Sequence, residues 1–192
     1  MGREFELKFR ATPAQQDAIL EEFGDFSPIS METTYYDTPS RTLSSQRITL
    51  RRRLENGTSV CTLKTPGTGY SRGEWNVEEN EIAAAIPKLC KLSGIAELPK
   101  WAQAGLHPLC AARFVRQRKT LSLPDFTAEL ALDRGGLLGA GREMALCELE
   151  LELISGSESA LVEYAKDLAS QYGLEPEPES KFRRAMSLAT GE

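Results

Sequence analysis

The sequence is poor in the residues that most enzymes use for nucleophilic or zinc chemistry. Its 192 residues include one histidine, His107, and no CxxC pair. The four cysteines lie far apart in the chain, at Cys61, Cys90, Cys110 and Cys147. These shortages exclude most Ser-His-Asp triads and the usual zinc sites, which need closely spaced cysteine and histidine. We interpret the four thiols as reduced, structural groups of a cytoplasmic protein, and we expect His107, beside Pro108, in a loop.

The chain also lacks long apolar runs and an excess of positive charge. No amino-terminal stretch resembles a signal peptide and no segment is apolar for long enough to span a bilayer, so no membrane partner is expected. The 23 Lys and Arg against 28 Asp and Glu give a formal charge of −5, which argues against nucleic acid as a partner. A hydrophobic content of 41% and a charged content of 27% are typical of a folded globular protein. The length suits one domain over residues 1–192.

Short alternating segments predict about eight strands with helices between them. Thr12 and Pro13 predict the start of a helix, and Gly24 its end. Asn56-Gly57 predicts a tight hairpin between two strands, and a Ser/Pro loop is expected before residue 31. Expected strands lie within residues 3–10, 31–40, 46–67 (two), 69–79, 110–123, 125–135 and 136–155, the last as a bulged or interrupted hairpin. Expected helices lie within residues 13–24, 81–106 (broken at Pro87 and Pro99), 157–173 and 175–189.

Each predicted strand has one apolar face and one charged face. In REFELKFR, residues 3–10, the even positions carry Glu4, Glu6, Lys8 and Arg10 while Phe5, Leu7 and Phe9 face the other way. In CELELELI, Glu148, Glu150 and Glu152 alternate with apolar residues. The same alternation aligns Arg51 with Arg53, Arg116 with Arg118, Thr62 with Lys64, Glu129 with Asp133, and Arg72 with Glu74 and Asn76.

Two architectures fit this alternation. One is an open sheet whose charged face meets solvent. It fits less well, because Ser and Thr are scarce on that face and three carboxylates at about 7 Å spacing on one strand repel each other. The other is a closed barrel with the charged face inward and helices over the apolar outside. We therefore predict an α+β fold: a closed eight-stranded antiparallel β-barrel, or tunnel, with a charged interior.

The interior charges indicate the ligands. Clustered carboxylates bind hard divalent cations, so Mg²⁺ or Mn²⁺ is expected as one or two ions. Arginine and lysine around the wall match the oxygens of a polyanion. A metal ion and a small molecule with a phosphate chain would satisfy both sets.

The run Glu4-Phe5-Glu6-Leu7-Lys8, an ExExK motif, resembles the amino terminus of the CYTH superfamily, the triphosphate tunnel metalloenzymes. TYYDTP, LRRR, TLK, RGEWNV, the Arg116-x-Arg118 pair, ELALD, CELELEL and SKFRR follow in that family's order, and the resemblance covers the whole chain. It implies a tunnel that holds a triphosphate end-on with divalent metal. The implied metal ligands are Glu4, Glu6, Glu148 and Glu150, with Glu152 as a further candidate. The implied phosphate-binding residues are Lys8, Arg51, Arg53, Lys64, Arg72, Arg116, Arg118, Lys181 and Arg183.

The implied reaction is attack by water on the terminal phosphorus of inorganic triphosphate, giving diphosphate and phosphate. Glu4, Glu6, Lys8 and Glu150 are the implied catalytic residues, and the implied wall residues that orient the cations are Glu74, Asn76, Glu129 and Asp133. Alternatives within the fold are a thiamine or nucleoside triphosphatase and a class IV adenylate cyclase. Outside catalysis, a polyphosphate-binding module and a purely structural sheet remain. We expect a monomer or a homodimer.

Overall fold

The computed structural model describes residues 2–191 and contains nine strands and six helices over that range. The strands are β1 (Glu4–Arg10), β2 (Ser27–Asp37), β3 (Thr49–Glu55), β4 (Thr58–Thr65), β5 (Ser71–Glu78), β6 (His107–Ser122), β7 (Phe126–Gly139), β8 (Arg142–Gly156) and β9 (Glu175–Pro176). The helices are α1 (Pro13–Phe23), α2 (Thr42–Ser45), α3 (Ile82–Ser93), α4 (Leu98–Gln103), α5 (Glu158–Tyr172) and α6 (Lys181–Thr190). Within residues 2–191, no helix is both long and apolar enough to cross a membrane.

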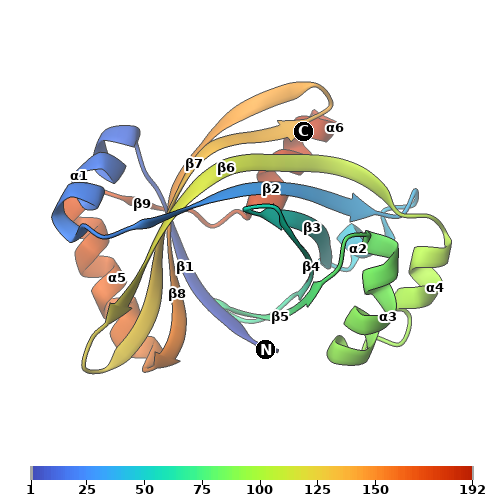
Figure 1. Cartoon of the computed structure of the whole chain (residues 1–192), viewed down its shortest axis with the longest axis horizontal. Coiled ribbons are helices and arrows are strands. Elements are labelled where there is room, and N and C mark those ends of the chain that lie inside the picture. The colour runs from blue at the N-terminus through green and yellow to red at the C-terminus, as the bar shows by residue number, and fades with distance from the viewer. Residues whose placement is uncertain (1, 192) are drawn as a thin grey trace.

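Eight antiparallel strands close into a barrel, as predicted. The order is β5-β4-β3-β2-β6-β7-β8-β1, and β1 pairs back onto β5. Figure 1 shows these strands curving around a common interior. The two seams of β1 differ greatly in length. Five residue pairs join β1 to β8, whereas two pairs, Glu4 with Arg72 and Phe5 with Ser71, join β1 to β5. The short strand β9 pairs with the other end of β1.

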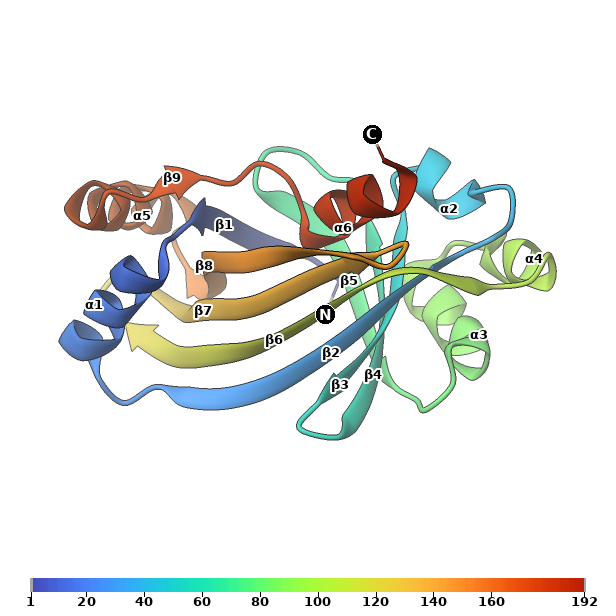
Figure 2. The ribbon, with the colours of Figure 1, turned by 90° about the horizontal axis from the view of Figure 1, so that it is seen from above.

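Two apolar clusters cover the outside of the barrel, so the predicted inside-out arrangement is confirmed. Phe5, Leu7 and Phe9 are buried with the outward leucines of β7 and β8 beneath α1 and α5. A second cluster packs β3, β4 and β5 against α3 and α4. Figures 1 and 2 show these helix pairs at opposite ends of the molecule. Each fully buried aliphatic side chain contributes about 1.5–3 kcal/mol relative to an exposed one.

A third apolar cluster lies on the inner face of the sheet. Met31, Tyr35, Ala112 and Phe114 join Leu137 and Leu146 there, and α6 packs on them through Phe182, Ala185, Met186 and Ala189. Along β6 these apolar residues share the inward orientation of Arg116, because they are separated from it by two or four positions. The inner face therefore changes from charged to apolar along the strands, and α6 covers the apolar part.

The local expectations were mostly confirmed. Thr12 caps α1 with Pro13 in the first turn, and Ser157 and Gly173 bound α5. Asn56 and Gly57 both have positive φ, as the predicted hairpin turn requires. Asp37, in the DTP stretch, ends β2. Its fully buried carboxylate accepts hydrogen bonds from the backbone N–H groups of Thr38, Leu43 and Ser44. Leu43 and Ser44 belong to helix α2, which was not predicted.

Three local expectations were wrong. Residues 27–30 are the beginning of β2 rather than a loop, because they pair with residues 115–118 of β6. Pro87 does not break the middle helix but lies inside α3, whose buried face, including Ala85 and Leu89, outweighs one lost backbone hydrogen bond. His107 and Pro108 begin β6 rather than lying in a loop, with His107 opposite Asp37.

Candidate metal and triphosphate site

The interior of the barrel contains a cavity of about 370 Å³. Most of the predicted site residues line it: Glu4, Glu6, Lys8, Arg51, Arg53, Lys64, Arg72, Glu74, Asn76, Arg116, Arg118, Glu129, Glu150, Glu152 and Lys181. They come from β1, β3, β4, β5, β6, β7, β8 and α6, so strands far apart in the sequence converge on one space. Period-two alternation is sufficient to predict this convergence once the sheet is closed.

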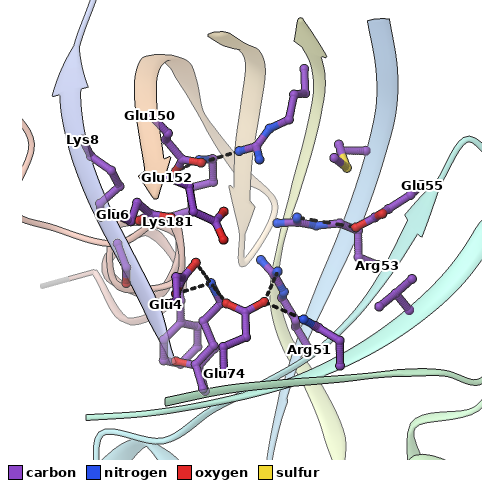
Figure 3. A pocket seen from close by; sticks show the side chains of 18 of the residues that line it. Glu4, Glu6, Lys8, Arg51, Arg53, Glu55, Glu74, Glu150, Glu152 and Lys181 are labelled. Carbon is purple, nitrogen blue, oxygen red and sulfur yellow. Dashed lines mark hydrogen bonds and ion pairs between the residues drawn. The ribbon is translucent and has the colours of Figure 1, made fainter. Parts of the chain in front are cut away.

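Glu4, Glu6 and Glu152 form one acidic group at the β1–β8 seam. Each offers a carboxylate oxygen within 4.8 Å of the others, since Glu6 lies directly opposite Glu152 in the strand pairing. Figure 3 shows the three carboxylates gathered on one side of the cavity. Hard oxygen ligands at this spacing fit Mg²⁺ or Mn²⁺.

The proton affinities within this group differ strongly. Burial raises the pKa of Glu6 to about 7, with the charge of Glu150 adding to the effect. Burial likewise raises the pKa of Glu152 to about 8, reinforced by Glu4 and Glu6. Burial acts the same way on Glu4, but Lys64 and Arg72 outweigh it and lower the pKa of Glu4. No cation of residues 2–191 forms an ion pair with Glu152, so this half-buried carboxylate lacks the positive partner that a bound metal ion would supply.

A second acidic group lies deeper and is already neutralised by protein cations. Asp133, Glu148 and Glu150 are all buried. The Lys181 ammonium lies 2.7 Å from Asp133 and 2.7 Å from Glu150, and also contacts Glu148. Arg116 donates to both oxygens of Asp133, at 2.8 and 2.7 Å, and contacts Glu150.

These ion pairs keep Lys181 charged. Burial disfavours the ammonium, but Asp133, Glu148 and Glu150 outweigh burial and raise the pKa of Lys181. Burial opposes ionisation of Asp133 and Glu150 too, yet Lys181 and Arg116 lower both pKa values. Glu148 differs, because burial and the neighbouring Glu150 raise its pKa. The group is a closed ion-pair network around Lys181.

The structure thus divides the five predicted metal ligands between two places. It groups Glu152, the added candidate, with Glu4 and Glu6. It places Glu148, whose side chain does not line the cavity, against Lys181 and Arg184. The reason is strand register: Glu152, Glu150 and Glu148 lie opposite Glu6, Lys8 and Arg10 in turn, so only Glu152 is level with a β1 carboxylate.

Arg183 is not brought to the cavity. Its side chain is 75% exposed and pairs with Glu179 at 3.0 Å. The next residue, Arg184, is 13% exposed and points inward to contact Glu148. On a helix, consecutive side chains diverge by about 100°, so Lys181 and Arg184, three residues apart, share a face whereas Arg183 does not.

Several cations of the cavity remain only weakly paired, and two of them, Arg51 and Arg53, face the first acidic group across it. Arg51 has its nearest carboxylate, Glu74, at 3.9 Å, and its buried Nε has no acceptor among the described residues. Arg53 lies 3.8 Å from Glu55, and burial lowers the pKa of Arg53 to about 10, with Arg51 and Arg116 adding to the effect. The Lys8 ammonium donates to the backbone carbonyl of Glu179 at 3.1 Å. Figure 3 shows Arg51 and Arg53 opposite Glu4 and Glu152.

Several residues of this region were not predicted, and four of them carry charge or an aromatic ring. Glu55 lines the cavity 3.8 Å from Arg53, and Phe182 contacts the Tyr35 ring with centroids 5.2 Å apart. Glu177 and Arg184 form ion pairs behind Lys181. The only sequence signal for them was the spacing of Glu175, Glu177 and Glu179 at every second position, which indicates a short extended segment.

The chain belongs to the CYTH domain family, whose model matches residues 2–186. An inorganic triphosphatase of Haemophilus influenzae is 27% identical over 199 aligned positions, which cover 99% of this chain and 56% of that protein. This chain therefore spans little more than half the length of that relative.

Solved structures show the same fold. A candidate adenylyl cyclase from Hippeastrum, in which a triphosphatase activity is dominant, superposes with a TM-score of 0.68 and 18% identity, covering 98% of this chain and 97% of that one. A candidate adenylate cyclase from Bacillus halodurans gives 0.66 and 20%, covering 96% and 98%. PH1012 from Pyrococcus horikoshii gives 0.59 and 22%, covering 97% and 99%.

Proposed function

We propose that this protein, acting as a single domain, hydrolyses inorganic triphosphate to diphosphate and phosphate with the help of Mg²⁺ or Mn²⁺. The observation that carries the proposal is the division of the cavity: three carboxylates with an unpaired member on one wall, and under-paired arginines on the opposite wall. The similarity to an inorganic triphosphatase supports the same reaction.

The charge of the cavity favours joint binding of metal and polyanion. Its lining has eight Lys and Arg side chains and seven Glu side chains. Such a nearly neutral cavity attracts a multiply charged triphosphate only weakly, because the carboxylates repel it. A divalent cation held by Glu4, Glu6 and Glu152 would offset triphosphate charge and polarise a phosphoryl oxygen.

The protein groups have separate tasks in this reaction. Arg51, Arg53 and Lys8 bind the phosphate oxygens and hold the terminal phosphorus in line for attack by water. Lys181, kept charged by its carboxylates, stabilises the negative charge that develops as the bond between the terminal phosphorus and the bridging oxygen breaks. Water supplies the oxygen of the released phosphate, and diphosphate leaves with the bridging oxygen.

Two features favour the inorganic substrate over thiamine or nucleoside triphosphates. A volume of about 370 Å³ lies at the low end of small-molecule sites, which span roughly 300–1,000 Å³. The aromatic rings that line the cavity are Tyr35 and Phe182, and they pack on each other. Tyr35 is buried, so of the two rings only the half-buried Phe182 is accessible for stacking on a base or a thiazole ring.

A phosphate-release screen tests the proposal. Inorganic triphosphate, thiamine triphosphate, ATP and diphosphate would each be incubated with Mg²⁺, with Mn²⁺ and without metal. We expect the highest kcat/KM with triphosphate and activity only with metal. Cyclic AMP formed from ATP would overturn the hydrolase assignment, and tight triphosphate binding without turnover of any compound would indicate a binding module.

A further inference from the structure

A chain of alternating charges runs from the surface to the ion-pair network beneath α6. Arg10 Nε donates to Glu177 Oε2 at 2.8 Å, and Arg184 Nη1 lies 3.5 Å from the same oxygen. Arg184 Nη2 then contacts Glu148, which contacts Lys181. We define these four residues, Arg10, Glu177, Arg184 and Glu148, as the α6 ion-pair chain.

Glu177 is the centre of this chain. Its side chain is 1% exposed although it lies in an irregular segment between β9 and α6. Beyond its two arginine partners, its Oε1 accepts from the backbone N–H of Glu179 at 2.9 Å. Its own backbone N–H donates to the carbonyl of Lys8 at 2.9 Å. A buried carboxylate with this many partners fixes the segment that precedes α6.

The α6 ion-pair chain does not contact the substrate cavity. The cavity lining contains none of its four members, and Arg10, Glu177 and Arg184 line a separate pocket. The chain does contact two groups that reach the cavity. Its member Glu148 forms an ion pair with Lys181. In addition, the segment that contains Glu177 binds Lys8, because the Glu179 carbonyl accepts a hydrogen bond from the Lys8 ammonium.

We propose that Glu177, with Arg10 and Arg184, is a positioning residue that fixes α6 and thereby places the Lys181 ammonium in the cavity. Lys181 and Arg184 both form ion pairs with Glu148 from positions one turn apart on α6, which sets the rotation of α6 about its axis. Glu177 connects Arg184 to β1 through its ion pair with Arg10 and its hydrogen bond to the Lys8 carbonyl. The position of α6 is therefore fixed relative to the strand that carries the β1 carboxylates. The Nε of Arg184, buried without an acceptor among the described residues, indicates that this guanidinium is placed for its two ion pairs. The effect on catalysis rests on the proposed function.

The test compares Glu177→Gln and Arg10→Gln with the matched control Arg183→Gln, which removes an exposed ion pair of α6. Without substrate, we expect amide exchange in α6 to accelerate about tenfold or more in Glu177→Gln, with the barrel strands unchanged. For triphosphate hydrolysis we expect kcat and kcat/KM to fall together by about tenfold with KM nearly unchanged, because Lys181 stabilises charge that develops only in the transition state. Arg10→Gln should act in the same direction, and Arg183→Gln should match the unaltered protein.

A double-mutant cycle distinguishes positioning from general weakening. In a Lys181→Met background, Glu177→Gln should change kcat/KM less than about twofold, because its effect acts through Lys181. An undiminished effect in that background, or unchanged α6 exchange in Glu177→Gln, would overturn the proposal.

Two further outcomes are decided by the same measurements. If Glu177→Gln accelerates amide exchange throughout the barrel, the variant Arg10→Gln decides, because the Arg10 side chain is 58% exposed and its loss should not unfold the barrel. Faster exchange confined to α6 in Arg10→Gln supports the proposal, and unchanged α6 exchange refutes it. If the unaltered protein hydrolyses no triphosphate, the proposed function fails, and α6 exchange alone then decides the positioning role.

Discussion

Glu152 and Asp133 are both inward carboxylates of β-strands but belong to different acidic groups. We predict that loss of the Glu152 charge weakens metal binding, whereas loss of the Asp133 charge lowers stability. Glu152→Gln removes the carboxylate that has no cation partner among residues 2–191, whereas Asp133→Asn removes one held by Arg116 and Lys181 at 2.7–2.8 Å. Each change keeps the size of the side chain, so charge and ligand number are the variables.

For Glu152→Gln we expect metal affinity to fall at least about tenfold, the smallest loss usual even for residues that only support a ligand. Stability without metal should hold or rise slightly, because the substitution removes a half-buried carboxylate whose pKa partial burial has raised. For Asp133→Asn we expect metal affinity within about threefold of the unaltered protein. Its stability should fall by about 3 kcal/mol, the lower end for breaking a buried ion pair, which corresponds to a Tm lower by about 6–12 °C for a chain of this size.

Calorimetric titration with Mn²⁺ would measure the affinities, and urea unfolding without metal the stabilities. Glu143→Gln, at an exposed position near the β7–β8 turn, serves as the control and should change neither quantity. The reasoning is refuted if Asp133→Asn abolishes metal binding while Glu152→Gln retains it, since the metal would then lie in the Lys181 network.

Three more predictions follow from the same geometry. The raised pKa values of Glu6 (about 7) and Glu152 (about 8) mean that the metal-free folded state holds protons that the unfolded state releases. Its free energy of unfolding should therefore fall as pH rises from about 4.5 to about 8, most steeply between about pH 5 and 7, by at most about 1.4 kcal/mol per pH unit for each group; urea titrations with saturating Mg²⁺ should lose this slope, and a flat metal-free profile would contradict it. Gly139→Ala should cost about 1–3 kcal/mol and lower kcat/KM, because an added Cβ would lie 2.6 Å from the Ala185 carbonyl oxygen of α6; full activity would show that α6 tolerates displacement. Chelation by EDTA should abolish hydrolysis and weaken triphosphate binding, measured by equilibrium dialysis, whereas binding that is independent of metal would contradict the charge balance of the cavity.

The sequence was sufficient to predict which side chains point into the barrel. Alternation in REFELKFR and CELELELI has only one solution once a face is buried, since a shift by one residue exposes every leucine. It was not sufficient to predict which inward residues are level with each other. That depends on register between β1 and β8, two strands more than a hundred residues apart, and register decided that Glu152 rather than Glu148 joins Glu4 and Glu6.

The inner apolar surface was also missed, for a different reason. The inward residues of CAARF, Cys110, Ala112 and Phe114, look like ordinary core positions in sequence, yet they lie on the same face as Arg116. Only the position of α6, which no local pattern specifies, reveals that one face of a strand can be charged for part of its length and apolar for the rest. Glu177 and Arg184 were missed because ion pairs between segments leave no periodic signal.

The closure of the barrel has a consequence for the order in which the protein is made. The ribosome synthesises Glu4 and Glu6 well before their principal partner strand, β8, which begins at Arg142. Until that strand has emerged, β1 has no long edge to pair with, and its alternate phenylalanines and leucine remain exposed. Contacts of such long sequence separation fold slowly, so metal binding should be absent from nascent chains that stop before residue 152 and should arise abruptly once they pass it.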